Sequence, residues 1–202
     1  MSTTAGRRFA VSDASRELVG AVVPGGGGDE PTMAPVGRRD VPGAGGRADS
    51  ILGHLAKGPA DPTHRRVGRQ HWFRATRTPQ GTALTEFFDR GPDTMVRAWG
   101  EGAQWALEQA PTLLGCADDT SGFEDMAGRC ELLSRAHHAH PNLRIGATGN
   151  LAEALAPAVI EQKVTGPEAF GGLRRLWSRH GEPAPGPASL AGHPASGMLV
   201  PP

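Results

Sequence analysis

The sequence predicts an α+β fold, in which a small unit of short strands is followed by several helices and preceded by a glycine-rich tail. The chain has 202 residues, and its first 48 hold ten glycines and a single aromatic residue. All four tryptophans lie beyond Ser50. A segment so poor in apolar side chains does not bury enough surface to offset the entropy of ordering it. Residues 1–48 are therefore expected to form a disordered tail, unless the start codon has been assigned too far upstream.

Alternating aromatic, apolar and β-branched residues predict three short strands after the tail. These strands are expected over residues 71–75, 82–88 and 95–99. The first two flank residues 78–81, whose sequence TPQG is typical of a tight turn. The pattern therefore predicts a hairpin followed by a third strand.

Two helices are predicted downstream of the strands, because apolar residues recur there three or four positions apart. The first covers residues 101–114, with Pro111 and Gly115 as its breakers. The second covers residues 125–140 and ends at Pro141.

A further pair of helices is predicted from Asn150 onward. Asn150 and Glu153 have the spacing of a capping box. Pro157 costs about 3 kcal/mol inside a helix, so either the helix kinks there or a new helix starts at this residue. Thr165 is expected to cap the last helix, which runs to about His180. That helix carries an apolar stripe of Phe170, Leu173, Leu176 and Trp177.

Composition excludes several classes of protein. The formal net charge is zero, so overall charge does not indicate a nucleic-acid partner. The two cysteines form neither a disulfide framework nor the close C-x-x-C pair of a zinc site. No apolar run approaches the roughly 18 residues that span a bilayer. We therefore expect a cytoplasmic monomer with no membrane partner and no cofactor.

Polar clusters in the sequence do not predict an active site. His137, His138 and His140 lie near Cys130, which suggests a metal site. Histidines at a helix C-terminus are favoured by the helix dipole alone, and we prefer this interpretation. The acids between residues 118 and 125 are interrupted by Gly and Ser, as is typical of a solvated loop. We predict no metal site from these residues.

Basic residues are concentrated between residues 51 and 80, where six of them accompany a single acid, Asp61. Arg65 and Arg66 lie at the centre of this stripe. A basic stripe can bind the phosphates of a nucleic acid. The alternative is an ordinary solvated surface, because all of the 21 basic residues except Lys57 and Lys163 are Arg.

Residues 143–166 contain a predicted helix with a characteristic end. There, an apolar residue is followed in turn by a glutamine, a β-branched residue and a small hydroxyl residue. These are Ile160, Gln162, Val164 and Thr165. This pattern resembles the opening of the glycosylase domain in helix–hairpin–helix DNA glycosylases of the DNA-3-methyladenine glycosylase II type. Upstream, residues 58–63, 72–79 and 98–103 resemble the small N-terminal domain of the same family. The resemblance covers residues 51–185.

The resemblance implies a hydrolase of base excision repair, which flips an alkylated base out of double-stranded DNA and cleaves its N-glycosidic bond. In this family a glycine-rich hairpin holds the DNA phosphate, and an Asp downstream of it stabilises the cationic sugar. Neither is present in this sequence. We therefore assign no catalytic residue and expect the chain to be truncated and inactive by itself. The alternatives are a non-enzymatic DNA-binding remnant and an unstable truncated gene product, in which the apolar stripe of the last helix would be exposed.

The family motif also implies which residues meet DNA. Gln162 and Lys163 match the helix end that faces the gap left by the flipped base, where relatives often have an apolar wedge in place of Lys163. Thr165, Arg65 and Arg66 complete the expected DNA-binding set, and the expected location is cytoplasmic, with nucleoid association in a prokaryote.

Four units are expected along the chain. They are a disordered tail over residues 1–48, a small β-containing domain over 49–125, a partial helical glycosylase domain over 126–185, and a Pro/Gly-rich tail over 186–202.

Overall fold

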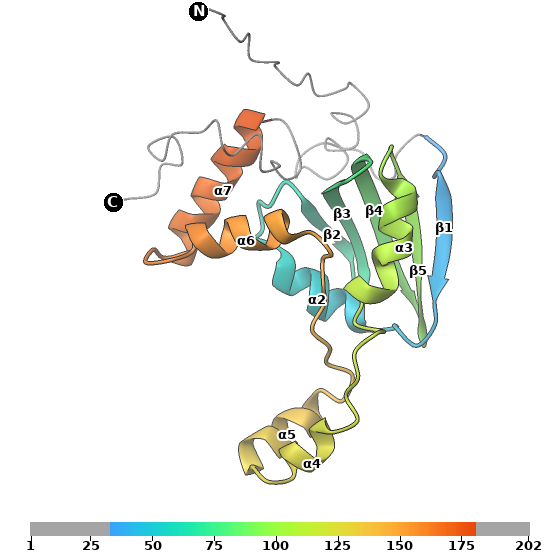
Figure 1. The fold of residues 1–202 in the computed structure, drawn as a ribbon, viewed down its shortest axis with the longest axis vertical. Helices are drawn as coiled ribbons and strands as arrows, with labels where there is room; N and C mark the ends of the chain where they lie inside the picture. The colour runs from blue at the N-terminus through green and yellow to red at the C-terminus, as the bar shows by residue number, and fades with distance from the viewer. Residues whose placement is uncertain (1–32, 181–202) are drawn as a thin grey trace, which may run out of the picture.

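The computed structural model describes residues 33–180 and contains a five-stranded antiparallel sheet with helices packed against one face (Figure 1). The strand order is β1-β5-β4-β3-β2. The strands are β1 (Gly37–Val41), β2 (His64–Gly68), β3 (His71–Thr78), β4 (Gly81–Arg90) and β5 (Asp93–Trp99). The helices are α2 (Arg47–Leu55), α3 (Ala103–Leu113), α4 (Phe123–Ala127), α5 (Glu131–Ala139), α6 (Leu151–Ile160) and α7 (Gly166–His180). The α+β fold class is confirmed.

The predicted hairpin and third strand are present as β3, β4 and β5. Thr78 pairs with Gly81 at the hairpin turn, and the register continues to His71 opposite Phe88. The folded part also begins earlier than expected, because β1 and the first residues of α2 lie within the range 1–48 that was predicted to be a tail. The predictions for residues 1–32 and 181–202 lie outside the described residues.

The main apolar core lies between the sheet and the two helices α2 and α3. Its members are buried and come from β1, α2, β3, β4, β5, α3 and the residues that adjoin them; Trp72 and Phe87 are its aromatic members. Helix α3 lies over β1, β5 and β4, whereas α2 lies over β3 and β4 (Figure 1). Gly102 permits the close start of α3, since a Cβ there would lie 2.3 Å from Thr78 Oγ1.

Helix α3 includes Pro111, which was expected to break it. A proline at this position leaves the carbonyl oxygen of Leu107 without its helical donor. The guanidinium of Arg39, on β1, donates to that oxygen from 3.2 Å. The helix therefore continues to Leu113, because Arg39 of strand β1 supplies the donor that Pro111 lacks.

The opposite face of the sheet carries a second buried apolar cluster. Phe73, Ala75, Leu84 and Trp99 form it, and each is at most 2% exposed. These residues alternate along their strands with members of the main core, as the pleat of a strand requires. Both faces of the sheet are therefore buried at its centre.

Glu86 lies on this same opposite face and binds the side chains of Arg97 and His71. It accepts from Arg97 Nε, and its Oε1 lies 2.8 Å from His71 Nε2. Burial alone raises the pKa of Glu86, but the hydrogen bonds and charges of Arg97 and His71 together outweigh burial. The pKa of Glu86 is therefore below its ordinary value, and this carboxylate is ionised when the sheet is formed.

The predicted helix over residues 125–140 is wrong as a single element. The structure has two short helices, α4 and α5, separated by Gly128, Arg129 and Cys130. Gly128 is a poor helix former, and the hydrogen bonds from Gly128 and Arg129 close the first helix. The pair forms a small hairpin set apart from the sheet (Figure 1), and no residue of α5 is buried.

The last two helices are confirmed near their predicted positions. Helix α6 runs continuously through Pro157 to Ile160, which answers the alternative left open at that proline. Asn150 caps it by accepting from the backbone N–H of Glu153 at 3.3 Å. The reciprocal half of the capping box does not form, since the Glu153 side chain binds the sheet instead.

The apolar stripe of α7 is largely buried, contrary to the exposure expected under the alternative of an unstable truncated product. Leu173 is 1% exposed and Trp177 is 8% exposed, and both pack with Ile160 of α6. Phe170 packs against Gly58, where φ is +86° and a Cβ would lie 3.0 Å from the ring. The loop before β2 therefore covers part of the stripe.

Candidate nucleic-acid interface and the cavity beside it

The predicted DNA-facing helix end forms the turn between α6 and α7. Gln162 and Lys163 are both exposed on this turn. Lys163 has a φ of +60°, a left-handed conformation that costs a residue with a side chain roughly 1–2 kcal/mol. No ion pair of its ammonium group is found within residues 33–180. The turn therefore presents an unneutralised positive charge on a strained backbone.

Thr165 binds the start of α7. Its backbone N–H and its hydroxyl both donate to Glu168 Oε2, at 2.9 and 2.7 Å. These two bonds lower the pKa of Glu168, so its carboxylate is charged at the helix N-terminus. A DNA phosphate would have to displace Glu168 in order to bind Thr165.

Arg65 and Arg66 lie on opposite faces of the edge strand β2. Arg65 stacks over Phe73 at 5.4 Å, and Arg66 stacks over Trp72 at 5.9 Å. Arg66 also forms an ion pair with Asp49 at 2.8 Å. The two arginines do not form one phosphate-binding surface, because adjacent residues of a strand point to opposite sides.

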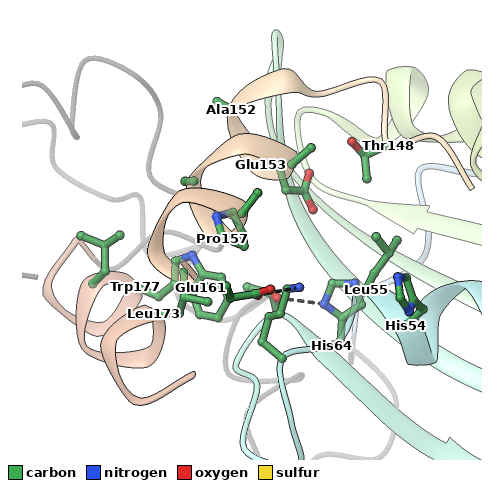
Figure 2. Close-up of a pocket in the computed structure, with 16 residues that line it drawn as sticks. His54, Leu55, His64, Thr148, Ala152, Glu153, Pro157, Glu161, Leu173 and Trp177 are labelled. Atoms are coloured by element: carbon green, nitrogen blue, oxygen red, sulfur yellow. Dashed lines mark hydrogen bonds and ion pairs between the residues drawn. The ribbon is translucent and has the colours of Figure 1, made fainter. Parts of the chain in front are cut away.

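A cavity of about 190 Å³ lies where α2, the loop before β2, α6 and α7 meet (Figure 2). Its apolar wall includes Leu55, Pro157, Leu173 and Trp177. Its polar lining comprises the side chains of His54, Lys57, Thr63, His64, Thr148, Glu153 and Glu161. The sequence analysis did not identify this cavity, whose lining comes from segments about a hundred residues apart.

A buried cluster around Asp61 fixes His64 at this cavity. Asp61 is 0% exposed and accepts from the Thr63 hydroxyl at 2.6 Å and from the Lys57 backbone N–H at 2.7 Å. Burial raises the pKa of Asp61, but the hydrogen bonds from His64, Thr63 and the Lys57 backbone outweigh burial and lower that pKa. Asp61 is therefore ionised, and the Thr63 hydroxyl donates a hydrogen bond to it.

Because the single hydrogen of the Thr63 hydroxyl is used in the bond to Asp61, its oxygen can only accept from His64. The distance from Thr63 Oγ1 to His64 Nδ1 is 2.9 Å, so Nδ1 carries a hydrogen. In the neutral ring, Nε2 then holds an unshared electron pair. That atom is buried and has no hydrogen-bond partner among the described residues.

Two carboxylates of α6 line the cavity in different ways. Glu153 uses both oxygens on the sheet, 2.7 Å from Arg74 Nη2 and 2.7 Å from Thr76 Oγ1. Glu161 lies at the other end of the helix, with Oε1 2.8 Å from Lys57 Nζ. Glu153 thus anchors α6 to β3, whereas Glu161 is held through one oxygen only.

The histidine and cysteine cluster that suggested a metal site lies in the α4–α5 hairpin, outside both the α6–α7 turn and the cavity lining. His137 lies 3.9 Å from Glu124 within the α4–α5 hairpin, and Cys130 is exposed. Within residues 33–180, no group of three or more His, Cys, Asp or Glu side chains is arranged to hold a metal ion. No helix of the same range has the length and apolar character needed to cross a membrane.

Comparison with known proteins gives a likeness of fold. No protein-family model matches this chain, and no curated protein matches it. Among solved structures, the 3-methyladenine DNA glycosylase from Archaeoglobus fulgidus has a similar fold, with a TM-score of 0.52 and 17% identity. The match covers 70% of this chain and 50% of that one, so the chain spans half the length of the glycosylase. At this identity the likeness is one of fold: the described chain has a glycosylase-like α+β architecture.

Proposed function

We propose that this chain is part of a DNA repair protein of the 3-methyladenine glycosylase type, and that its α6–α7 turn meets double-stranded DNA carrying a damaged base. The observation that carries the proposal is Lys163, which is exposed, unneutralised by described residues and held at a φ of +60°. Backbone strain of this kind is concentrated at functional sites, because folding alone does not favour it. The fold likeness and the sequence pattern around Gln162 support the same surface.

The chemistry of this turn suits phosphate and base edges. Lys163 supplies a mobile cation, which is attracted to the phosphate backbone without regard to sequence. Gln162 supplies an amide that both donates and accepts, as the edges of exposed bases require. We propose that Lys163 contacts a phosphate beside the lesion and that Gln162 faces the gap left by the flipped base.

We assign DNA binding, and not base release, to the described residues. The buried carboxylates among them are held by protein groups: Asp61 by Thr63 and His64, Glu86 by Arg97 and His71, and Asp89 by the Thr94 hydroxyl and the Gly46 backbone N–H. An assay of base release from alkylated duplex DNA tests this assignment, and we expect none from the purified chain. Measurable release would contradict it.

The binding test is fluorescence anisotropy with a labelled duplex that contains an abasic-site analogue, compared with the intact duplex over a range of salt concentrations. We expect Lys163→Ala to weaken binding and to reduce the slope of log K against log salt by about 0.9, the value for one phosphate contact. Arg135→Ala is the matched control, since Arg135 is exposed on the remote helix α5. Arg66→Ala should have a smaller effect than Lys163→Ala, because Asp49 already neutralises Arg66.

Unchanged affinity and unchanged salt slope in Lys163→Ala would contradict the proposed interface. An equal loss of DNA affinity in Arg135→Ala would show that affinity depends on the total charge of the chain and not on the α6–α7 turn. We further propose that the chain binds as a monomer, so sedimentation of the complex should show one copy per damaged duplex, and a larger assembly would contradict this.

A further inference from the structure

We propose that the cavity between α2, α6 and α7 binds a small uncharged ring that carries an N–H group beside a carbonyl, as in a cyclic imide or lactam. This inference is independent of the proposed DNA interface, because it rests on the lining of the cavity alone. Such sites commonly form where two structural units meet, with mostly apolar walls and a few polar groups. Figure 2 shows this arrangement, with Pro157, Leu173 and Trp177 from the helices and His64 from the strand side.

Size limits the ligand to a single ring. The cavity volume is about 190 Å³. Each water molecule occupies about 30 Å³ in the liquid, so the cavity corresponds to roughly six waters. This space suits a six-membered ring with a few substituents and is too small for a nucleotide.

Charge limits the ligand to a neutral molecule. Lys57 and Glu161 neutralise one another at 2.8 Å, and Glu153 is neutralised by Arg74 at 2.7 Å. A charged ligand would lose hydration on entering this apolar space without gaining an unpaired counter-ion. The apolar wall formed by Leu173 and Trp177 favours a flat, weakly hydrated ring.

The unsatisfied polar groups specify the pattern of donors and acceptors. Glu153 and Thr63 are fully engaged by the protein, so they do not contribute. His64 Nε2 has no described partner, and in the neutral ring it is an acceptor. Glu161 Oε1 lies 2.8 Å from Lys57 Nζ but is buried without a hydrogen-bond partner among the described residues, so it remains an acceptor, and the adjacent ammonium group of Lys57 keeps hydrogens to donate. An N–H beside a C=O complements an acceptor that lies beside a donor.

The buried nitrogen of His64 is the reason to expect a ligand at all. The His64 side chain is 5% exposed, and its orientation is fixed by Thr63 and Asp61 on the other side of the ring. Leaving a buried polar atom unsatisfied costs roughly as much as losing a hydrogen bond, so folded proteins rarely do so without a use. A ligand donor would satisfy it.

The test uses the full chain with uracil and 1,3-dimethyluracil as probes, since methylation removes both N–H groups and keeps the ring. Long-range ¹H–¹⁵N correlation spectra of ¹⁵N-histidine-labelled protein report on His64 Nε2 directly. We expect saturable binding of uracil, with a dissociation constant between the micromolar and low-millimolar ranges. We expect dimethyluracil to bind at least about tenfold more weakly, because it leaves the acceptors unpaired.

Variants locate the site. Ala156→Leu fills the cavity from α6 and should abolish uracil binding, and Ala152→Leu, one turn earlier, serves if the first variant does not fold. Ala136→Leu is the matched control, because Ala136 is exposed on α5 and does not line the cavity. The absence of saturable shifts with uracil, equal binding of the two probes, or unchanged uracil binding in a folded cavity-filled variant would each overturn the proposal.

Discussion

Replacing Glu153 with glutamine should separate the helical unit from the sheet. Glu153 lies near the start of α6, and its two oxygens bind Arg74 and Thr76 of β3 at 2.7 Å each. The Arg74 side chain is only 4% exposed, and its Nε has no partner among the described residues. Without the carboxylate, a buried guanidinium loses its counter-ion. The substitution therefore tests whether this ion pair holds α6 in place.

The magnitude follows from burial. Removing one partner of a buried ion pair costs about 3–5 kcal/mol, because the other charge stays buried and uncompensated. The glutamine amide oxygen still accepts one hydrogen bond, which is worth about 1 kcal/mol. We expect Glu153→Gln to lower the free energy of unfolding by about 2–4 kcal/mol and Glu153→Ala to lower it by about 3–5 kcal/mol.

Urea unfolding followed by tryptophan fluorescence measures these changes, and hydrogen exchange of residues 150–177 shows whether the loss is local. Glu108→Gln is the control, because Glu108 is exposed and should change stability by less than about 0.5 kcal/mol. The double variant Arg74→Met/Glu153→Met should recover most of the loss, since no buried charge remains. A Glu153→Gln protein within about 0.5 kcal/mol of the parent, or a double variant no more stable than Glu153→Met alone, would refute the reasoning.

Three further outcomes are expected. Gly102→Ala should lower the free energy of unfolding by about 1–3 kcal/mol, because its Cβ would lie 2.3 Å from Thr78 Oγ1, whereas Gly122→Ala, with nothing within 4 Å, should be nearly neutral in the same urea titration. The pKa of Glu86 is depressed, so its stabilising contribution is present above its ordinary value of 4.5 and is lost as the pH falls through the folded-state pKa; Glu86→Gln should flatten unfolding free energy against pH in that acidic window, and an unchanged slope would contradict this. Lys163→Gly should raise thermal stability relative to Lys163→Ala by about 1 kcal/mol, because only glycine adopts a φ of +60° without strain, and equal melting temperatures would show that the turn is unstrained.

Local sequence signals predicted most of the sheet and the ends of the later helices. The TPQG turn and the alternation around it gave the β3–β4 hairpin, because turn chemistry and strand period act over a few residues. Thr165 and the glycine and proline after it gave the start of α7 for the same reason. Where the structure differs from these predictions, the side chain that determines the local conformation interacts with a residue far away in the sequence.

Pro111 illustrates such a partner. Its effect on α3 depends on Arg39, which donates to the Leu107 carbonyl from a strand 68 residues earlier. The fate of the Glu153 side chain depends likewise on Arg74, 79 residues away. Neither pairing is visible in a local pattern, because capping and breaking rules consider one helix at a time.

The cavity could be predicted only in part. Asp61 and Thr63 have the spacing of an Asx turn, which the backbone bond from Thr63 N to Asp61 Oδ1 at 2.7 Å confirms, so that turn was open to prediction. The approach of Glu161 and Trp177 to His64 requires the packing of α6 and α7 beside the loop before β2. Sequence spacing does not encode that approach.

The position of β1 in the sheet has a consequence for the order of folding. The strands from β2 to β5 follow one another in both sequence and space, so each pairing closes a short loop. The pairing of β1 with β5 instead joins Gly37 to Ala98 and must wait for the intervening chain to be arranged. We expect the meander from β2 to β5 to form in the folding nucleus and β1 to dock after the rate-limiting step. Substitutions in β1 should accordingly speed unfolding and leave the folding rate nearly unchanged.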